Sequence, residues 1–346
     1  MAERGPWEPR DGRRYLAAVV GAGSWGTAFA CHLVRCGVAA ALLSRRAEQA
    51  EAIARDRRNP DYLTALALPP ELTTGTYTSW DFSAVDLAVM AVPSKAYASV
   101  VTLLADRLPH GLAVLSLTKG VDPGTLRRLS QVLEEGWARL EPRVAVLSGP
   151  NHAEEVSLGK PTATVIASHD DALVARLRDI LSTDTFRVYS NPDLVGVEFA
   201  AAVKNIIAIA SGMCDGVGYG DNARAALLTR GLAEMSRLGS ALGADPLTFS
   251  GLAGMGDLVA TCTSGHSRNR RAGELIARGH SPVQVEDEMG MVAEGMTAAP
   301  AILRLAGEHG IEMPITENVV AVLSGQKDLM AAVRDLMGRQ PRPERH

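Results

Sequence analysis

Cysteine and aromatic residues are scarce in this chain of 346 residues. Its four cysteines are scattered and form no C-x-x-C pair: Cys31, Cys36, Cys214 and Cys262. This spacing gives no disulfide framework and no zinc knuckle, and it favours a reduced, cytoplasmic compartment. Aromatic residues amount to 4% of the chain, too few for a surface on which nucleic-acid bases stack.

A positive charge excess and a long hydrophobic run are also missing. The 35 Lys and Arg residues stand against 39 Asp and Glu, a formal net charge of −4, which argues against nucleic acid as a partner. The most apolar stretch, residues 195–213, is interrupted by Glu198, Lys204 and Asn205, so we expect no membrane span. Residues 1–14 lack the apolar core of a secretory signal. We predict that they form a disordered tail and that residues 339–346 form a frayed one.

The first half of the chain alternates short apolar runs with helical patterns. Near-continuous apolar runs are typical of parallel strands that are covered on both faces. We predict strands over residues 16–20, 39–43, 86–92, 112–118, 144–148, 162–168 and 185–189. We predict helices between them over residues 24–36, 95–107 and 123–136. This alternation indicates the α/β class, with a doubly wound sheet.

The pattern changes after a turn cluster at residues 190–193. No convincing strand follows. We predict helices over residues 195–214, 222–242, 246–251, 268–277, 297–309 and 316–324, with helix starts at Ser281 and Thr316. The chain is therefore predicted to have an α/β domain over residues 15–191 and an all-helical domain over residues 192–338.

A glycine motif follows the first predicted strand. Gly21, Gly23 and Gly26 form G-x-G-x-x-G where a strand ends and a helix begins. In such a Rossmann-type turn the first glycine makes the tight turn, the second admits a pyrophosphate and the third lets helix and strand pack closely. The alternative is an ordinary glycine turn. Because strand, helix and second strand occur in the right order, we predict that the domain over residues 15–191 binds a dinucleotide.

Two arginines follow the second predicted strand, at the position that distinguishes NAD from NADP in such domains. NAD sites usually carry an acidic residue here, bonded to the ribose 2′-hydroxyl. This chain has Arg45 and Arg46 instead, and their charge and planar shape suit a 2′-phosphate. A solvated, basic helix start is the alternative. We expect NADP(H) as the favoured cofactor, with NAD(H) possible.

Lys204 is the only charged residue between Glu198 and Asp215, within a predicted apolar helix. Burial would lower its pKa toward neutrality and suit it to general acid–base catalysis at a carbonyl. The alternatives are a lysine that reaches out from the helix edge or one partner of a structural ion pair. Asp257 either orients Lys204 or caps a helix that begins at Leu258. Lys119, in the loop after the fourth predicted strand, is either a ligand-binding residue or an exposed loop lysine.

A polar cluster at Ser267, Arg268 and Asn269 precedes a predicted helix. A hydroxyl, a guanidinium and an amide at a helix start can clamp a phosphate, although a solvated basic helix end has the same composition. Cys262 and His266 are four residues apart but have no further ligand nearby, so we expect no metal. Together these residues point to a reductase of a small phosphorylated ketone.

These stretches resemble the bacterial NAD(P)-dependent glycerol-3-phosphate dehydrogenase family over about residues 16–338. The most specific motifs lie at residues 21–26, 118–120, 148–150, 203–205, 216–238, 254–258, 267–271, 292–295 and 312–317. The resemblance implies reduction of dihydroxyacetone phosphate to sn-glycerol 3-phosphate for membrane lipid synthesis. It also implies a cytoplasmic homodimer.

By position, the resemblance makes Lys204 the proton donor or acceptor, with Asp257 and Lys119 beside it. It implies contacts to glycerol 3-phosphate from Lys119, Gly149, Asn151, Lys204, Asn205, Asp257, Ser267, Arg268 and Asn269. It implies contacts to the cofactor from Ser24, Trp25, Arg45, Lys119, Ala153, Arg268, Val292 and Glu294. The chain departs from the family at Asn151 and His152, where a hydroxyl residue and Phe are usual, and in the loop over residues 64–70.

Two alternatives remain open. One is a related hydroxyacid or ketopantoate-type reductase, in which a phosphate clamp at residues 267–271 would have less to bind. The other is a non-catalytic NADP(H) sensor, which would need neither Lys204 nor Asp257.

Overall fold

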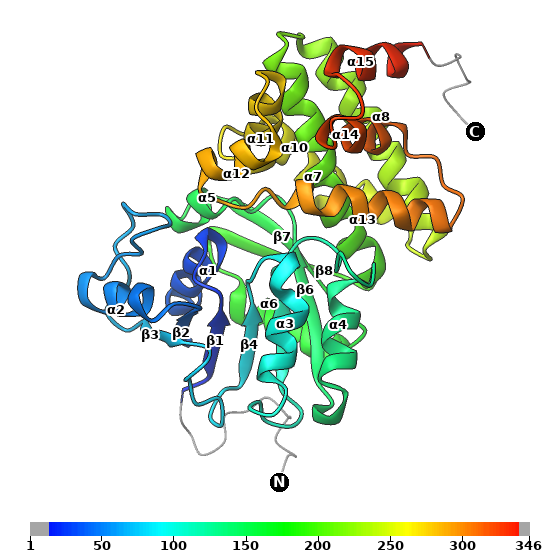
Figure 1. Cartoon of the computed structure of the whole chain (residues 1–346). Coiled ribbons are helices and arrows are strands. Elements are labelled where there is room, and N and C mark those ends of the chain that lie inside the picture. Colours follow the sequence, from blue (N-terminus) through cyan, green and yellow to red (C-terminus); the bar gives the residue numbers. More distant parts are fainter. Residues whose placement is uncertain (1–13, 339–346) are drawn as a thin grey trace.

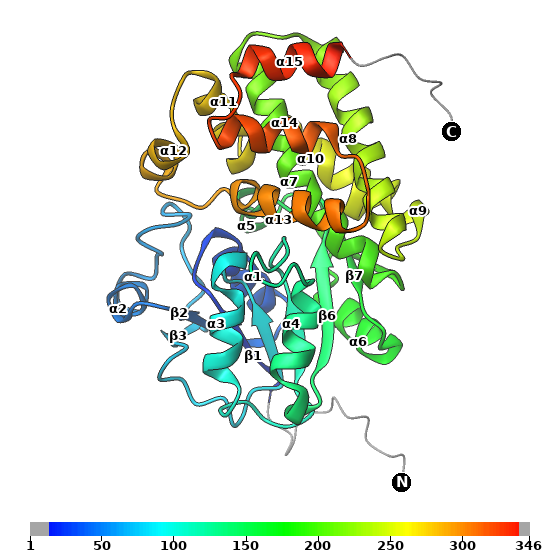
Figure 2. The ribbon, with the colours of Figure 1, turned by 45° about the vertical axis from the view of Figure 1, so that its right-hand side comes forward.

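The computed structural model describes residues 14–338. The predicted tails therefore lie outside the described residues, apart from Arg14. The described chain consists of a layered sheet and a helical bundle stacked on one edge of it (Figure 1). The strands up to residue 148 point their carboxyl ends toward the bundle, as the arrowhead of β6 (Arg143–Ser148) shows in Figure 2, and the two strands that follow run the opposite way.

One eight-stranded sheet runs in the order β3-β2-β1-β4-β5-β6-β7-β8. Its strands are β1 (Leu16–Val20), β2 (Ala39–Ser44), β3 (Thr73–Thr76), β4 (Leu87–Met90), β5 (Ala113–Ser116), β6 (Arg143–Ser148), β7 (Thr162–Ala167) and β8 (Phe186–Asn191). The order reverses between β1 and β4, which is the crevice where open α/β sheets bind ligands. All seven predicted strands are present, and the doubly wound α/β class is confirmed.

Two features of the sheet differ from the prediction. The edge strand β3 was not predicted because its sequence, Thr-Thr-Gly-Thr, contains no apolar residue. Strands β6 and β7 pair antiparallel, whereas all other neighbours are parallel. An antiparallel pair needs no crossover over the sheet, and the connection from Ser148 to Thr162 carries only the short helix α5 (Ala153–Ser157).

The other helices of the sheet layers are α1 (Ser24–Arg35), α2 (Ala47–Asp56), α3 (Ser94–Leu104), α4 (Leu129–Gly136) and α6 (Asp171–Leu181), with a 3₁₀ turn at Ala138–Leu140. The prediction placed the start of α4 six residues too early. The residues before it form a turn instead, because Asp122 accepts a hydrogen bond from the Thr125 amide and Leu126 adopts a left-handed φ of 62°. Helices α2, α5 and α6 were not predicted.

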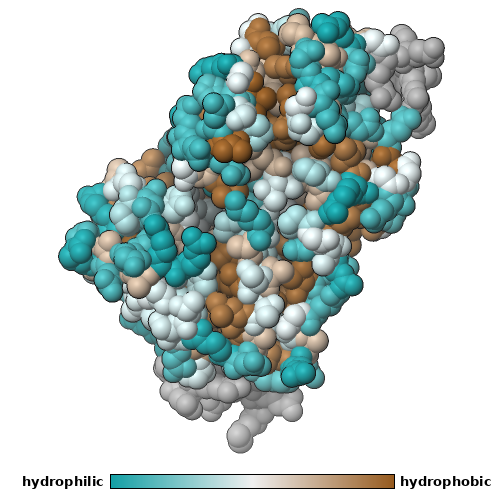
Figure 3. All heavy atoms as spheres, in the orientation of Figure 1, coloured by the Kyte–Doolittle hydropathy of each residue, from teal (hydrophilic) through white to brown (hydrophobic). Residues whose placement is uncertain are grey.

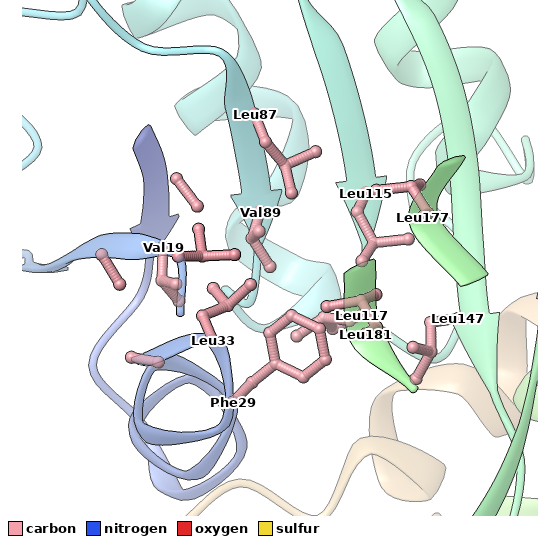
Figure 4. Close-up of a cluster of buried hydrophobic side chains, with 14 of the residues drawn as sticks. Val19, Phe29, Leu33, Leu87, Val89, Leu115, Leu117, Leu147, Leu177 and Leu181 are labelled. Carbon is pink, nitrogen blue, oxygen red and sulfur yellow. The ribbon is translucent and has the colours of Figure 1, made fainter. Parts of the chain in front are cut away.

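The apolar strands are buried on both faces, as their sequences predicted. On one face, Val19 and Val89 pack with Phe29 and Leu33 of α1 and with Leu181 of α6 (Figure 4). On the other face, a second cluster forms against α3 and α4. This double burial holds the carboxyl ends of the central strands in fixed positions, and the loops that leave them are anchored accordingly.

Beyond Asn191, the described residues form helices and connections without a strand, as predicted. The helices are α7 (Leu194–Gly216), α8 (Asp221–Ala241), α9 (Pro246–Phe249), α10 (Asp257–Thr263), α11 (Arg268–Ala277), α12 (Pro282–Met289), α13 (Glu294–Glu308), α14 (Pro314–Leu323) and α15 (Leu329–Met337), with a π-helical turn at Leu252–Gly256. Ser281 caps α12 as predicted. The predicted start at Thr316 is wrong, because α14 begins at Pro314, a residue suited to a first helical turn.

Helix α7 is the centre of the bundle. By length and composition alone it could cross a membrane, but 94% of its apolar window is buried inside the protein. Such burial is that of a core helix. The face shown in Figure 3 is largely hydrophilic at its rim, with hydrophobic side chains visible in several separate areas.

Candidate active site

A cleft of about 920 Å³ opens between the sheet and the helical bundle. It is bordered by the glycine motif, the loops after β4 and β5, and parts of α7, α11 and α13. The predicted site residues that line it are Gly21, Gly23, Ser24, Trp25, Arg45, Arg46, Lys119, Asn151, Ala153, Lys204, Asn205, Ser267, Arg268, Asn269, Val292 and Glu294. Gly26, Gly149 and Asp257 do not line the cleft.

The three motif glycines have different surroundings. Gly21 has a φ of +117°, and a Cβ there would meet the Ala91 carbonyl oxygen at 2.6 Å. A Cβ on Gly26 would lie 1.9 Å from the Gly21 carbonyl oxygen, so this glycine allows close packing. No atom lies within 4 Å of a Cβ built on Gly23. The backbone thus makes a tight turn that leaves open space beside Gly23.

That open space lies at the start of α1, which has no side-chain cap. The first N–H groups of an uncapped helix are donors for an anion. Trp25 adds a buried indole nitrogen without a hydrogen-bond partner among residues 14–338. A dinucleotide pyrophosphate therefore fits the residues present.

The two arginines after β2 have different partners. Arg46 forms an ion pair with Asp61. Arg45 has no ion pair among the described residues, and it also lines the cleft. Arg45 is thus the arginine that remains available for an anionic group on a ligand.

Lys204 and Lys119 share one carboxylate. Lys204 Nζ lies 2.6 Å from Oδ1 of Asp257, and Lys119 Nζ lies 2.8 Å from Oδ2. Lys204 is 3% exposed, so it does not reach out from the helix edge. The capping alternative for Asp257 is also wrong, because Asp257 is the first residue of α10, follows Gly256 at the cap position and binds both lysines.

This arrangement changes the proton affinities. Burial lowers the pKa of Lys204 to about 7; the negative charge of Asp257 opposes the shift, and the positive charge of Lys119 adds to it. Burial raises the pKa of Asp257, but the two lysines outweigh that effect and hold it below its usual value. Lys204 can therefore gain and lose a proton near neutral pH while Asp257 stays ionised.

Thr261 is a further member of this site that the sequence analysis did not single out. Its Oγ1 accepts a hydrogen bond of 2.6 Å from Lys204 Nζ, and it also contacts Asp257 at 3.3 Å. The sequence analysis offered a helix from Leu258 only as an alternative; a helix that includes both Asp257 and Thr261 would have revealed this residue, since residues four apart share a helix face.

Lys119 is held in place by the loop after β6. Its Nζ donates to the Gly149 carbonyl at 3.1 Å and to Asn151 Oδ1 at 3.0 Å. Asn151 in turn donates to Thr164 Oγ1 at 3.0 Å. Because its side chain is only 17% exposed, Lys119 is not an exposed loop lysine.

The predicted clamp lies at the start of α11, beside the part of α7 that carries Lys204. Ser267 caps α11, its Oγ accepting from the Arg270 amide. Asn269 donates to Asn205 Oδ1 at 3.0 Å and accepts from the Gly295 amide at 2.8 Å. Arg268 lines the cleft and has no ion pair among the described residues. The clamp therefore presents one uncommitted guanidinium.

Glu294 joins the two sides of the cleft. Its carboxylate accepts from the Ser94 hydroxyl at 2.5 Å and from the Ser94 amide at 3.3 Å. Burial raises its pKa, and the Ser94 hydroxyl opposes that shift. Residues 14–338 contain no group of three or more His, Cys, Asp or Glu that could hold a metal ion.

Reduction of a carbonyl by a dinucleotide requires a proton donor beside the reacting oxygen. Lys204 offers one in a cleft whose other end fits the dinucleotide, so fold and site define an NAD(P)-dependent dehydrogenase. Two family models then cover nearly the whole chain: the NAD-dependent glycerol-3-phosphate dehydrogenase N-terminus at residues 17–174 and its C-terminus at residues 193–334. The chain belongs to the NAD-dependent glycerol-3-phosphate dehydrogenase family, as its motifs predicted, and is an oxidoreductase.

Individual proteins that are similar to this chain carry the name of the same family. A glycerol-3-phosphate dehydrogenase [NAD(P)+] of Moorella thermoacetica is 49% identical, covering 93% of this chain and 95% of its own. A protein of the same name from Prosthecochloris aestuarii is 46% identical, covering 95% and 99%. The solved glycerol-3-phosphate dehydrogenase of Coxiella burnetii is 37% identical, with a TM-score of 0.90 over 94% of this chain and 99% of its own. A ketopantoate reductase of Ralstonia eutropha is 19% identical with a TM-score of 0.59 and shares the fold alone.

Proposed function

We propose that this protein catalyses the reversible, NAD(P)H-dependent reduction of dihydroxyacetone phosphate to sn-glycerol 3-phosphate. The observation that carries the proposal is that the buried Lys204–Asp257–Lys119 arrangement shares one cleft with Arg268, which has no ion pair among the described residues. The test is to follow NADPH and NADH oxidation with dihydroxyacetone phosphate and with ketopantoate. Oxidation that depends on dihydroxyacetone phosphate supports the proposal, and oxidation with ketopantoate alone contradicts it.

Lys204 is the proton donor in this proposal. When bound, the cofactor supplies a hydride to the carbonyl carbon. Negative charge then develops on the carbonyl oxygen, where the Lys204 ammonium stabilises it and donates a proton. In the reverse direction the neutral amine takes the proton back. Asp257 and Thr261 hold the Nζ atom in place, and Lys119 adds a second positive charge beside it.

The clamp binds the substrate phosphate. Arg268 supplies a planar pair of donors, and the start of α11 beside Ser267 adds the favourable dipole of a helix N-terminus. Asn269 and Asn205 complete this end of the cleft. A carboxylate substrate would use fewer of these donors, which favours a phosphorylated ketone over ketopantoate.

The residues that would hold the cofactor line the cleft at the carboxyl ends of the central strands. The open space beside Gly23 and the start of α1 would accept its pyrophosphate, with Ser24, Trp25 and Ala153 beside it. Val292 and Glu294 would border its nicotinamide end. Arg45 would pair with a 2′-phosphate, so NADP(H) is favoured and NAD(H) is possible.

At the scale of the chain, we propose a dinucleotide-binding domain over residues 15–191 and a substrate and catalytic domain over residues 192–338. The change from sheet to helices at α7 supports this boundary. The family resemblance supports a cytoplasmic homodimer that supplies glycerol 3-phosphate for phospholipid synthesis.

A further inference from the structure

His152 is a cleft residue to which the proposed reaction gives no role. It stands between Asn151 and Ala153 and borders the same space as the two lysines. Its Nε2 lies 3.2 Å from the carbonyl oxygen of Ala260 in α10. A carbonyl oxygen only accepts hydrogen bonds, so Nε2 carries the hydrogen. In the neutral ring, Nδ1 is then an acceptor.

The surroundings keep this ring neutral. Burial lowers the pKa of His152; the Ala260 contact opposes that shift, the positive charges of Lys204 and Lys119 add to it, and Asp257 opposes it. The ring of His266 faces it with a centroid separation of 6.4 Å. At neutral pH the Nδ1 atom therefore keeps its lone pair.

The acceptors that contact the two lysines are already in use. The Gly149 carbonyl and Asn151 Oδ1 already accept from Lys119. Asp257 is 2% exposed, and its carboxylate binds both lysines. Most other polar groups bordering this end of the cleft, such as the two lysines and Arg268, are donors.

Dihydroxyacetone phosphate has one hydrogen-bond donor, which needs one acceptor from the protein. Its phosphate and its carbonyl oxygen accept hydrogen bonds, whereas its terminal hydroxyl is the only group that donates one. We propose that Nδ1 of His152 accepts this hydroxyl hydrogen, which makes His152 the residue that selects hydroxymethyl ketone phosphates over methyl ketone phosphates. This assignment rests on the proposed function.

The test compares two substrates that differ in that hydroxyl alone. kcat/KM is measured for dihydroxyacetone phosphate and for hydroxyacetone phosphate in the wild type, H152F and H152Q. The preference for the hydroxyl should fall about tenfold in H152F, the contribution of one neutral hydrogen bond, through the loss on dihydroxyacetone phosphate. H152Q should retain more of the preference, because an amide can donate to Ala260 and accept from the hydroxyl.

The control is H266F, which alters the neighbouring ring and should keep the ratio within about twofold of the wild type. In the wild type the ratio should also fall in acid, where protonation turns Nδ1 into a donor, while the H152F ratio stays flat. An unchanged ratio in folded H152F, or a wild-type ratio that is flat with pH, overturns the role of His152. A wild type that reduces neither ketone overturns the proposed function as well.

Discussion

At the scale of single residues, the site depends on one lysine, Lys204, which stands in an apolar core helix where a charged side chain is unusual. A charge in the middle of an apolar core helix is costly, and such conflicts with local rules concentrate at functional sites. Lys204 could therefore be found from the sequence alone. Its contact with Lys119 through Asp257 could not, because the three residues are up to 138 positions apart and only the fold brings them together.

Cofactor preference should depend on Arg45 more than on Arg46. Losing a charge-assisted hydrogen bond costs about 1.5–3 kcal/mol, so R45A should raise the KM for NADPH by about tenfold to a hundredfold and leave the KM for NADH nearly unchanged. R46A is the matched control, because Arg46 is paired with Asp61. Steady-state kinetics with both cofactors checks this. Equal effects of R45A on NADPH and NADH would contradict it.

At the scale of elements, the start of α14 is held by a carboxylate from another helix. Glu234 of α8 accepts from the amides of Ile315 at 2.6 Å and Thr316 at 3.3 Å. Burial raises its pKa to about 7, and these backbone bonds oppose the shift. The carboxyl group thus caps a helix whose own sequence supplies no side-chain cap.

The raised pKa predicts a pH-dependent stability. The folded state binds the Glu234 proton more tightly than the unfolded state, so this contribution is complete below about pH 4.5 and is lost as pH rises to about 7. E234Q should remove the loss, which amounts to about 3 kcal/mol. Urea unfolding of both proteins at pH 5 and pH 8 measures it. An equal change between the two pH values in wild type and E234Q would contradict the prediction.

Element types were more predictable than element ends. Apolar periodicity gave seven strands and the bounds of α11, because both follow from which residues are buried. The ends depend on particular side chains, such as Asp122 before α4, and on left-handed residues such as Leu126. The edge strand β3 escaped detection because an edge strand needs no continuous apolar run.

At the scale of the whole molecule, the cleft exists only while the two parts keep their relative position. Several polar contacts join them, among them those of Lys119 with Asp257, Ser94 with Glu294, and Arg128 with Glu198. Glu198 also accepts from the amide and hydroxyl of Ser130 at the start of α4. Since Glu198 lies on α7 six residues before Lys204, this contact fixes the helix that carries the proton donor.

Removing the Glu198 carboxylate should weaken the contact between the sheet part and the helical bundle. Deleting one partner of a buried ion pair costs about 3–5 kcal/mol, so E198A should lose stability by that amount and also lose turnover. E198Q should lose less, because its amide keeps one acceptor for the Ser130 N–H and can donate to the Ser130 hydroxyl. Urea unfolding and NADPH titration check this, because the glycine motif lies elsewhere and its affinity should persist. A stable E198A with full turnover would show that the contact of Glu198 with Arg128 and Ser130 does not hold α7 in place.

The central claim is that Lys204 transfers the proton, and the pH profile of kcat/KM tests it most directly. With a Lys204 pKa of about 7, reduction needs the protonated amine, so its rate should fall as pH rises through about 7. Oxidation needs the neutral amine and should rise over the same range. In folded K204A, which still binds NADPH, both limbs should vanish and the rate should drop by about 10²–10⁴. If K204A kept a near-normal rate and the pH dependence of the wild type, Lys204 would not be the group that transfers the proton.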